Sequence, residues 1–199
     1  MDEALANIVA FVEGRMSPVA FESLAYHDPN IEAVLANDPT LRPDTYIGAN
    51  THLFVIQQDF ASPSGILNVH GAMTQFLERR GIAFTPTQSH AELHTHILAA
   101  QPKWLDIPMD WLTRNVLPAA AGRNGRVLRD WLRQQFLERF RCAGKPPKWI
   151  QNPDWPIGDS GPLVFMGQVQ IPNYFHDEAA AYVFHDPATG RCETVIQVA

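Results

Sequence analysis

Residues 145–162 read KPPKWIQNPDWPIGDSGP, and this stretch separates two kinds of sequence. Proline fixes its own φ angle and pushes the preceding residue toward extended backbone, so the five prolines predict a rigid, extended connector. The last five residues, GDSGP, are one glycine short of the sequence around the nucleophile of trypsin-like proteases. This likeness raises a serine-hydrolase hypothesis for Ser160, while Gly, Asp, Ser and Pro are also the ordinary residues of a tight turn.

The sequence before the connector carries repeated helix start signals. Ser17-Pro18, Asp28-Pro29 and Thr85-Pro86 each place a capping side chain before a proline at the first helical position. The stretch ILNVHGAMTQFLERRGI, residues 66–82, is amphipathic and ends in glycine, as helices often do. Residues 51–60, THLFVIQQDF, fit a buried helix or a strand, and we favour the helix.

The clearest helix is RVLRDWLRQQFLERF, residues 126–140. Its apolar residues recur every four positions, which predicts one buried face, and we place Trp131 in the core beside that face. Its arginines lie elsewhere on the helix.

The sequence after the connector favours strands. LVFMGQVQI, residues 163–171, alternates in its second half, and AAAYVFHD and CETVIQVA flank the turn signal PATG at 187–190. We therefore predict an α+β fold with an N-terminal helical body and a small C-terminal antiparallel β-sheet. The expected domains are a mainly helical one, 1–143, and a connector with a small sheet packed on it, 144–199.

Composition limits the classes of function. The chain has 199 residues, 46% of them hydrophobic, and a net charge of −6, which argues against a general nucleic-acid binder. The two cysteines, Cys142 and Cys192, are far apart and indicate no disulfide framework. The first residues lack the basic start of a signal peptide, and no apolar run is long enough to span a bilayer. We expect a soluble, cytoplasmic protein that contacts no membrane and binds no nucleic acid.

Charge is unevenly distributed along the chain. Residues 1–113 carry a net charge of −8, residues 114–148 one of +7, and residues 149–199 one of −5. For the basic segment we favour a solvated helix face with internal ion pairs. Binding of phosphates by this segment is the alternative, and it predicts a nucleic-acid affinity that falls steeply with salt.

Histidines supply a second set of candidate chemical residues. In HAELHTH, residues 90–96, a helix places His90 and His94 on one face at a spacing that suits zinc. The glutamate of the HExxH motif is absent from its place, and further ligands would have to come from elsewhere, such as His176 or Asp177. Two His-Asp pairs, 176–177 and 185–186, also qualify as acid–base candidates, although Asp186-Pro187 is most simply the opening of a turn.

No catalytic constellation is complete in the sequence. A nucleophilic serine needs a histidine base and oxyanion donors, and His70, which precedes Ser160 in the chain, lies in a helical pattern. Glycine-rich phosphate loops are absent, so no nucleotide cofactor is expected. We therefore predict no catalytic residues, no metal and no cofactor. A metal-dependent or serine hydrolase that uses His90 and His94, or Ser160, is the alternative.

Several segments together resemble a known family. FVEGRMSPVAFESLAYHDPNIEAVL, KPPKWIQNPDWPI, PLVFMGQVQI and YVFHDPATGRCETVIQ are similar to immunity proteins of polymorphic-toxin and type VI secretion systems. The resemblance covers nearly the whole chain. It implies a stoichiometric inhibitor of a cognate toxin, in particular an effector with a restriction-endonuclease-like nuclease domain, and it carries over no catalytic residue. A homodimer is a further arrangement that the basic segment allows.

Candidate interface residues follow from exposure and charge. A nuclease active site is basic, so acidic side chains on the inhibitor would speed association, and tryptophan in a rigid connector loses little entropy on binding. Capping and turn chemistry explain the same residues without a partner. The predicted partner-binding set is Asp28, Glu32, Asp154, Trp155, Asp159, Asp177 and Glu178.

Overall fold

The computed structural model describes residues 2–42, 46–171 and 177–198. Helices occupy the first two-thirds of the chain and antiparallel strands the last part, which confirms the α+β prediction. The chain forms two compact units, Met1–Thr95 and His96–Ala199. The change from helix to strand expected at residues 143–144 lies inside the second unit. Among the described residues, no helix combines the length and the apolar character that crossing a bilayer requires.

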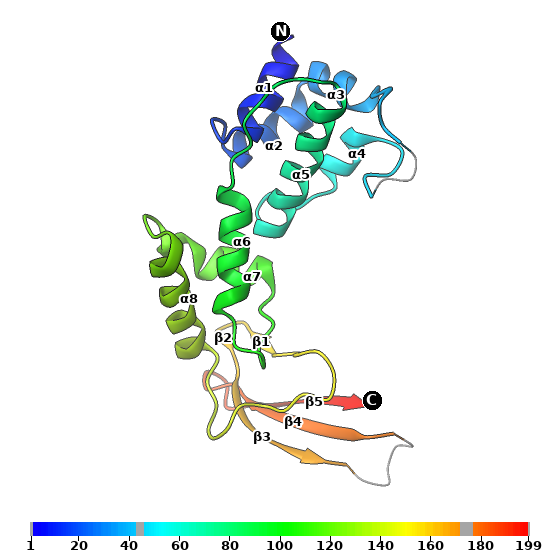
Figure 1. Ribbon diagram of the computed structural model, residues 1–199. Helices are drawn as coiled ribbons and strands as arrows, with labels where there is room; N and C mark the ends of the chain where they lie inside the picture. Colours follow the sequence, from blue (N-terminus) through cyan, green and yellow to red (C-terminus); the bar gives the residue numbers. More distant parts are fainter. Residues whose placement is uncertain (1, 43–45, 172–176, 199) are drawn as a thin grey trace. The chain divides into compact units, whose positions relative to one another are not determined.

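The first unit is built from short helices (Figure 1). Its elements are α1 (Glu3–Val12), α2 (Pro18–His27), α3 (Pro29–Ala36), α4 (Thr51–Ile56), α5 (Pro63–Arg79) and the start of α6 (Ser89–Ala100).

Two of the expected start signals act as predicted. The Ser17 hydroxyl accepts a hydrogen bond from the Ala20 amide at 3.2 Å, and the Asp28 carboxylate accepts one from the Asn30 amide at 2.8 Å. Both satisfy backbone donors that the first helical turn leaves free.

The expected helix start at Thr85-Pro86 is wrong, because α6 begins at Ser89. Residues 83–88 have no regular structure, and the Thr87 amide donates to the Val12 carbonyl at 2.9 Å. This segment therefore covers the end of α1 instead of adding a helical turn. Residues 51–56 do form a helix, as favoured from the sequence.

Aromatic and aliphatic side chains from α1 to α5 form the core of the first unit. The rings of Phe11 and Phe21 are stacked with centroids 4.3 Å apart, and both side chains are fully buried. Met73 and Phe76 on α5 are also fully buried. Burial of these large side chains is the main stabilising contribution to such a helical unit.

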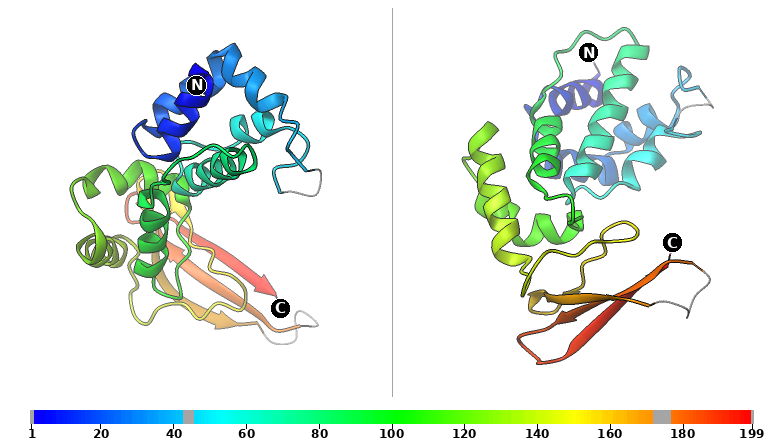
Figure 2. Two further views of the ribbon diagram at one scale, coloured as in Figure 1. Left: turned by 45° about the horizontal axis from the view of Figure 1, so that its top comes forward. Right: turned by 60° about the horizontal axis from the view of Figure 1, so that its bottom comes forward.

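The second unit combines helices with two small sheets. It contains α7 (Met109–Asn115), the 3-10 helix η1 (Leu117–Ala120), α8 (Gly125–Arg139), β1 (Ile157–Gly158), β2 (Gly161–Pro162), β3 (Val164–Gln170), β4 (Ala179–His185) and β5 (Cys192–Val198). The order β3-β4-β5 makes an antiparallel sheet, and β1 pairs with β2 separately. In Figures 1 and 2, α7 and α8 lie on one side of the three-stranded sheet.

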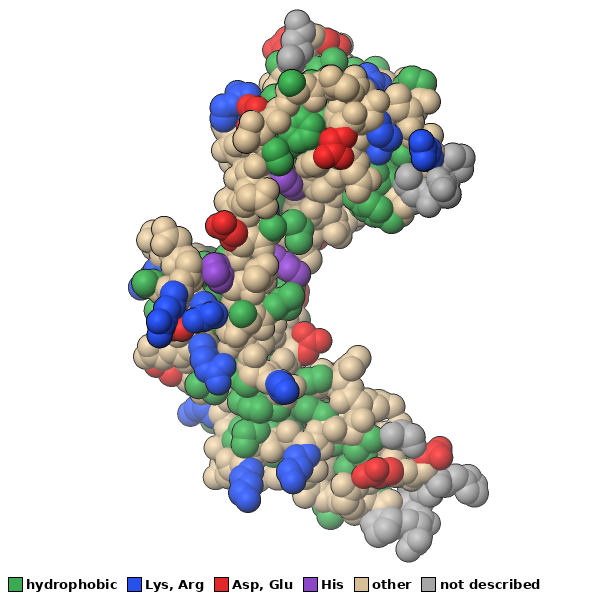
Figure 3. All heavy atoms as spheres, in the orientation of Figure 1, with side chains coloured by type: hydrophobic (Ala, Val, Ile, Leu, Met, Phe, Trp, Pro, Cys, Tyr) green, Lys and Arg blue, Asp and Glu red, His purple; other side chains and the backbone are tan. Residues whose placement is uncertain are grey.

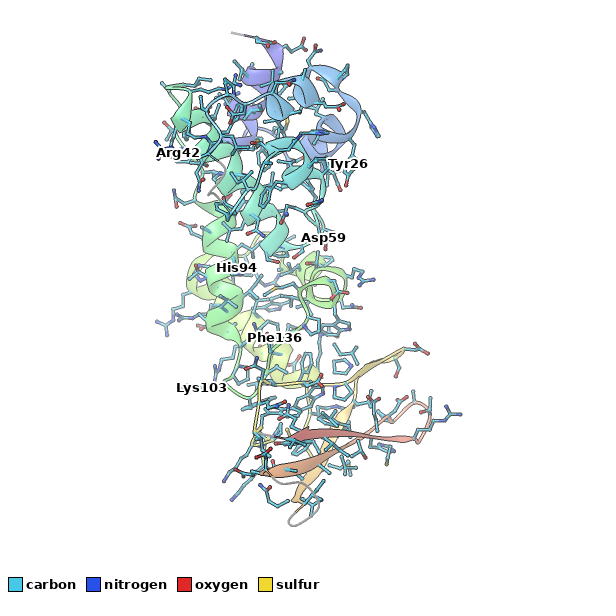
Figure 4. The ribbon with its side chains drawn as sticks, turned by 90° about the vertical axis from the view of Figure 1, so that its right-hand side faces the viewer. Tyr26, Arg42, Asp59, His94, Lys103 and Phe136 are labelled. Carbon is cyan, nitrogen blue, oxygen red and sulfur yellow. The ribbon has the colours of Figure 1, made fainter. Side chains whose placement is uncertain are left out.

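A row of aromatic rings joins these helices to the sheet. Trp111 contacts Phe140, Phe140 contacts Trp155, and Trp155 contacts Phe184 on β4, with centroids 5.2–5.6 Å apart. The buried face of α8, including Phe136, points into the same core (Figure 4). Trp131 is only half-buried, contrary to its predicted core position, and the Arg123 guanidinium lies 4.6 Å from the centre of its ring.

Candidate functional site

The GDSGP motif forms a tight hairpin. Gly158 pairs with Gly161, so Asp159 and Ser160 make the two-residue turn between β1 and β2. Gly161 has a φ of 120°, a conformation that other residues rarely adopt, and a Cβ on Gly158 would lie 3.1 Å from Leu163 Cδ1. The glycines are thus required by the turn and its packing.

The base of the hairpin is anchored in the core of the second unit. The Trp155 indole N–H donates to the Leu163 carbonyl at 2.9 Å, and the Leu163 amide donates to the Pro156 carbonyl at 3.1 Å. Trp155 is only 4% exposed. We therefore correct its prediction as a partner anchor: a neighbouring carbonyl and the rings of Phe140 and Phe184 already occupy the side chain.

Ser160 is held by a carboxylate. Its hydroxyl donates to Asp186 Oδ1 at 3.4 Å, and Asp186 also accepts hydrogen bonds from the Ala188 amide and the Thr189 hydroxyl. These bonds, that from the Ala188 amide foremost, lower the pKa of Asp186. Asp186 thus begins the β4–β5 turn, as expected, and ties the β1–β2 turn to it. A serine nucleophile needs a base that orients and deprotonates it, whereas this arrangement serves the two turns.

An open groove of about 540 Å³ lies beside the hairpin. Asp110, Trp111 and Arg114 of α7 line it together with Arg139 of α8 and the hairpin residues. Arg114 pairs with Asp110 on the same helix, and Arg139 donates to the Gln135 side chain at 3.3 Å. The groove therefore presents charges of both signs to solvent.

Asp159 is the one acidic residue at the tip of the hairpin, on the rim of this groove. It is exposed, and within the described part of the chain its carboxylate forms no ion pair. Because the turn below it is anchored, the carboxylate is presented on a defined scaffold. This combination makes the hairpin tip and its groove the candidate site.

The other predicted acids lie apart from this hairpin. Asp28 caps α3 and Glu32 is exposed in the first turn of that helix, both in the first unit. Asp154 is exposed in a separate hollow that Ile196 and Gln197 also line. Asp177 and Glu178 are exposed just before β4.

Two of the histidines, the buried His70 and the half-buried His90, contact each other. His70 donates from Nε2 to the Val12 carbonyl at 2.9 Å, and the His90 ring lies 5.3 Å from the His70 ring. His90 Nε2 is buried and has no hydrogen-bond partner among the described residues. Burial, and secondarily His70, lowers the pKa of His90. His90 therefore packs inside the first unit against Phe11 and His70, in contacts that sequence spacing alone could not reveal.

The described residues offer no metal site. No group of three or more His, Cys, Asp or Glu side chains there is placed to hold a metal ion. His94 and His96 are half-buried on α6. His176, the further ligand considered from sequence, lies outside the described residues.

Basic side chains gather over α8 and the segment after it (Figure 3). Asp130 pairs with Arg126 at 3.3 Å and with Arg129 at 3.6 Å, so part of the expected internal pairing is present. Arg133, Arg141, Lys145 and Lys148 are exposed and form no ion pair with any described residue. The predicted internal ion pairs therefore neutralise only the first part of this segment.

Comparison with known proteins gives no match: no family model, no curated protein and no solved structure resembles this chain closely enough to report.

Proposed function

We propose that the chain is an immunity protein that binds a cognate secreted bacterial toxin, a nuclease, and inhibits it stoichiometrically. The observation that carries the proposal is the exposed Asp159 carboxylate at the tip of the β1–β2 hairpin, without an ion pair among the described residues. The family resemblance of the sequence supplies the class of partner.

The β1–β2 hairpin is held in a fixed conformation, as an inhibitory loop requires. Its turn is short, Ser160 is tied to Asp186, and Trp155 and Leu163 fix its base. A loop already held in its binding conformation loses little conformational entropy when a partner engages it. The negative charge at its tip suits the basic cleft with which a nuclease holds phosphates, and it would also raise the association rate.

The groove supplies selectivity. Arg114 and Arg139 line it, so a partner that offers only positive charge would meet repulsion there. A matching toxin surface would place a basic group at Asp159 and an acidic or neutral group toward the arginines. Such alternation rejects wrong partners as well as favouring the right one.

The first experiment tests the function itself. The chain is co-expressed with the toxin encoded beside it, and we expect growth rescue and a complex of defined stoichiometry. If the pair gives neither rescue nor complex, the proposed function is wrong.

The second experiment tests the hairpin. Replacing a charged partner in a close interface pair weakens binding strongly, so Asp159→Lys should weaken the toxin complex at least about tenfold and abolish rescue. Glu92→Lys is the charge-matched control, because Glu92 is exposed on α6 and belongs to the first unit. Equal affinity of Asp159→Lys and the parent would exclude the hairpin while leaving the function to the first experiment.

A further inference from the structure

The two edges of the β3-β4-β5 sheet differ in their protection. On the β3 edge the Phe165 amide donates to the Arg141 carbonyl at 2.9 Å, and the Ala143 amide donates to the Phe165 carbonyl at 2.8 Å. A bulge between Phe165 and Gly167 further distorts that edge. On the β5 edge, no backbone segment among the described residues pairs with the strand, and the one contact to an outward backbone group comes from the Gln151 side chain at the Val198 carbonyl.

The geometry of the β4–β5 hairpin identifies which backbone N–H and C=O groups of β5 face away from β4. The Asp186 amide bonds the Arg191 carbonyl at 2.8 Å, so this is a hydrogen-bonded pair. Such pairs alternate along an antiparallel ladder, and residues 193, 195 and 197 therefore bond β4. Residues 192, 194, 196 and 198 turn their N–H and C=O groups to the free edge. The Val198 carbonyl, which accepts from the Gln151 side chain at 2.6 Å, agrees with this assignment.

The sequence of β5 lacks the usual edge protection. CETVIQV contains no lysine and no proline, its register with β4 is continuous, and Glu193 is its one charged residue. Thr194, Val195 and Ile196 are β-branched, and Ile196 is 54% exposed. Unpaired strands of this composition are ready templates for pairing with another strand.

We propose that β5 pairs antiparallel with β5 of a second copy of the chain, about a twofold axis at Val195, to make one continuous six-stranded sheet. This register overlaps every residue of Cys192–Val198 and sets the outward groups of residue 194 opposite those of residue 196 in the other copy. At its end, the Gln151 side chain has to release the Val198 carbonyl or share it with the Cys192 amide of the other copy. Shifting it by one hydrogen-bonded pair shortens the ladder.

Charge favours a second copy as the occupant. In the proposed register Glu193 lies opposite Gln197 of the other copy, so the only charge of the strand never meets itself. Arg191 of one copy and Glu178 of the other, which precedes β4, then lie at the same end of the combined sheet, about two strand spacings (~10 Å) apart. Opposite charges are therefore brought near each other, and like charges directly across the strands, which destabilise a sheet, are avoided.

The apolar surface also continues across this pairing. Val169, Ala181 and Ile196 form one row over the three strands on the face whose side chains are not packed in the core, with Val169 59% exposed. Residue 196 would adjoin Thr194 of the second copy, and the row would extend into the other sheet. The β1–β2 hairpin takes no part in this contact, so the inference stands apart from the proposed toxin site.

Sedimentation of the full chain over a concentration series tests the association. We expect a monomer–dimer equilibrium, of about micromolar Kd because the ladder is short. A chain that stays monomeric at the highest concentration reached overturns the proposal.

Thr194→Pro removes an N–H that faces the free edge and leaves the ladder with β4 intact. We expect it to weaken the dimer about tenfold or more, while the melting temperature measured at concentrations where both proteins are monomeric stays unchanged. Val169→Lys is the control on the exposed face: if it breaks the dimer while Thr194→Pro does not, the copies stack by their faces and edge pairing is wrong.

Cross-linking tests the register. In a background with Cys142→Ser and Cys192→Ser, Val195→Cys should form a disulfide between copies, because residue 195 faces itself in a pair without backbone hydrogen bonds. Thr194→Cys should not, since it faces residue 196. Cross-linking of Thr194→Cys alone would overturn the register at Val195.

Discussion

The two units use their charged side chains differently. In the first unit, Asp38 has a fully covered side chain and pairs with Arg79 at 2.9 Å, and Glu13 holds Arg15 and the Thr85 amide. In the second unit, the ion pairs of Arg114 with Asp110 and of Arg126 with Asp130 are exposed, and Asp159 forms no ion pair with any described residue. Internal pairing stabilises a fold, whereas exposed groups without partners are available for binding. We therefore expect removal of the Asp38 carboxylate to lower stability and removal of the Asp159 carboxylate to leave stability unchanged.

The largest expected effect is a loss of stability when the packed core of the first unit is disrupted. Phe11→Ala should destabilise it by about 3–5 kcal/mol, because it removes a buried ring and leaves a cavity. Denaturant unfolding, with hydrogen exchange to assign the loss to residues 1–95, measures this. Val169→Ala in the second unit is the control and should change little, since that side chain is exposed. A similar loss for both variants would contradict the contrast between the units.

The next largest effect is a loss of stability on removing the charge of Asp38. Asp38→Asn should cost about 2–4 kcal/mol, because it leaves Arg79 and Arg80 without their carboxylate in a largely covered site. Burial alone would raise the pKa of Asp38, but hydrogen bonds from Thr40 and Arg79 outweigh it and lower the pKa.

Asp159→Asn is the matched change in the second unit, and the same unfolding measurement should detect no loss of stability. Equal destabilisation by the two variants would mean that Asp159 is also needed by the fold, and the contrast would no longer hold.

The smallest effect is a pH dependence of the first unit. Because the pKa of His90 is lowered in the folded state, the unfolded chain binds the proton more readily, starting near its ordinary pKa of about 6.5. Stability from this residue is present above that pH and is lost as the pH falls below it. His90→Leu should flatten the decline of the melting temperature between pH 7 and pH 5.

His94→Leu is the control for this measurement, since His94 is half-buried on the same helix, and it should keep the decline. An unchanged slope in His90→Leu would assign the pH dependence to other groups.

Local signals in the sequence predicted much of the fold. Ser17 and Asp28 act within their own helical turns, and the turn after Asp186 forms within four residues, so neighbouring residues determine each. The predicted helix start at Thr85 is wrong because the Thr87 amide donates a hydrogen bond to the carbonyl of Val12, which is distant in sequence. This bond holds the segment extended. The boundary between the units falls inside α6, where the helical pattern is continuous and gives no signal.

The candidate site could be predicted only in part. GDSGP predicts a turn, and the position of Asp159 within it predicts an exposed acid. The groove forms because the fold places Arg114 of α7 and Arg139 of α8 beside the hairpin. Trp155 is buried because the rings of Phe140 and Phe184 pack against it. These are contacts between distant segments, which spacing along the chain does not encode.

Asp186 is shared by two turns, and this has a consequence for how such chains can diverge. It accepts hydrogen bonds from its own turn and from Ser160, which lies 26 residues earlier. A lineage that altered the β4–β5 turn would also loosen the tip that carries Asp159. The two loops are therefore expected to evolve as one inherited pair, with residues 160 and 186 changing together when the specificity of the tip changes.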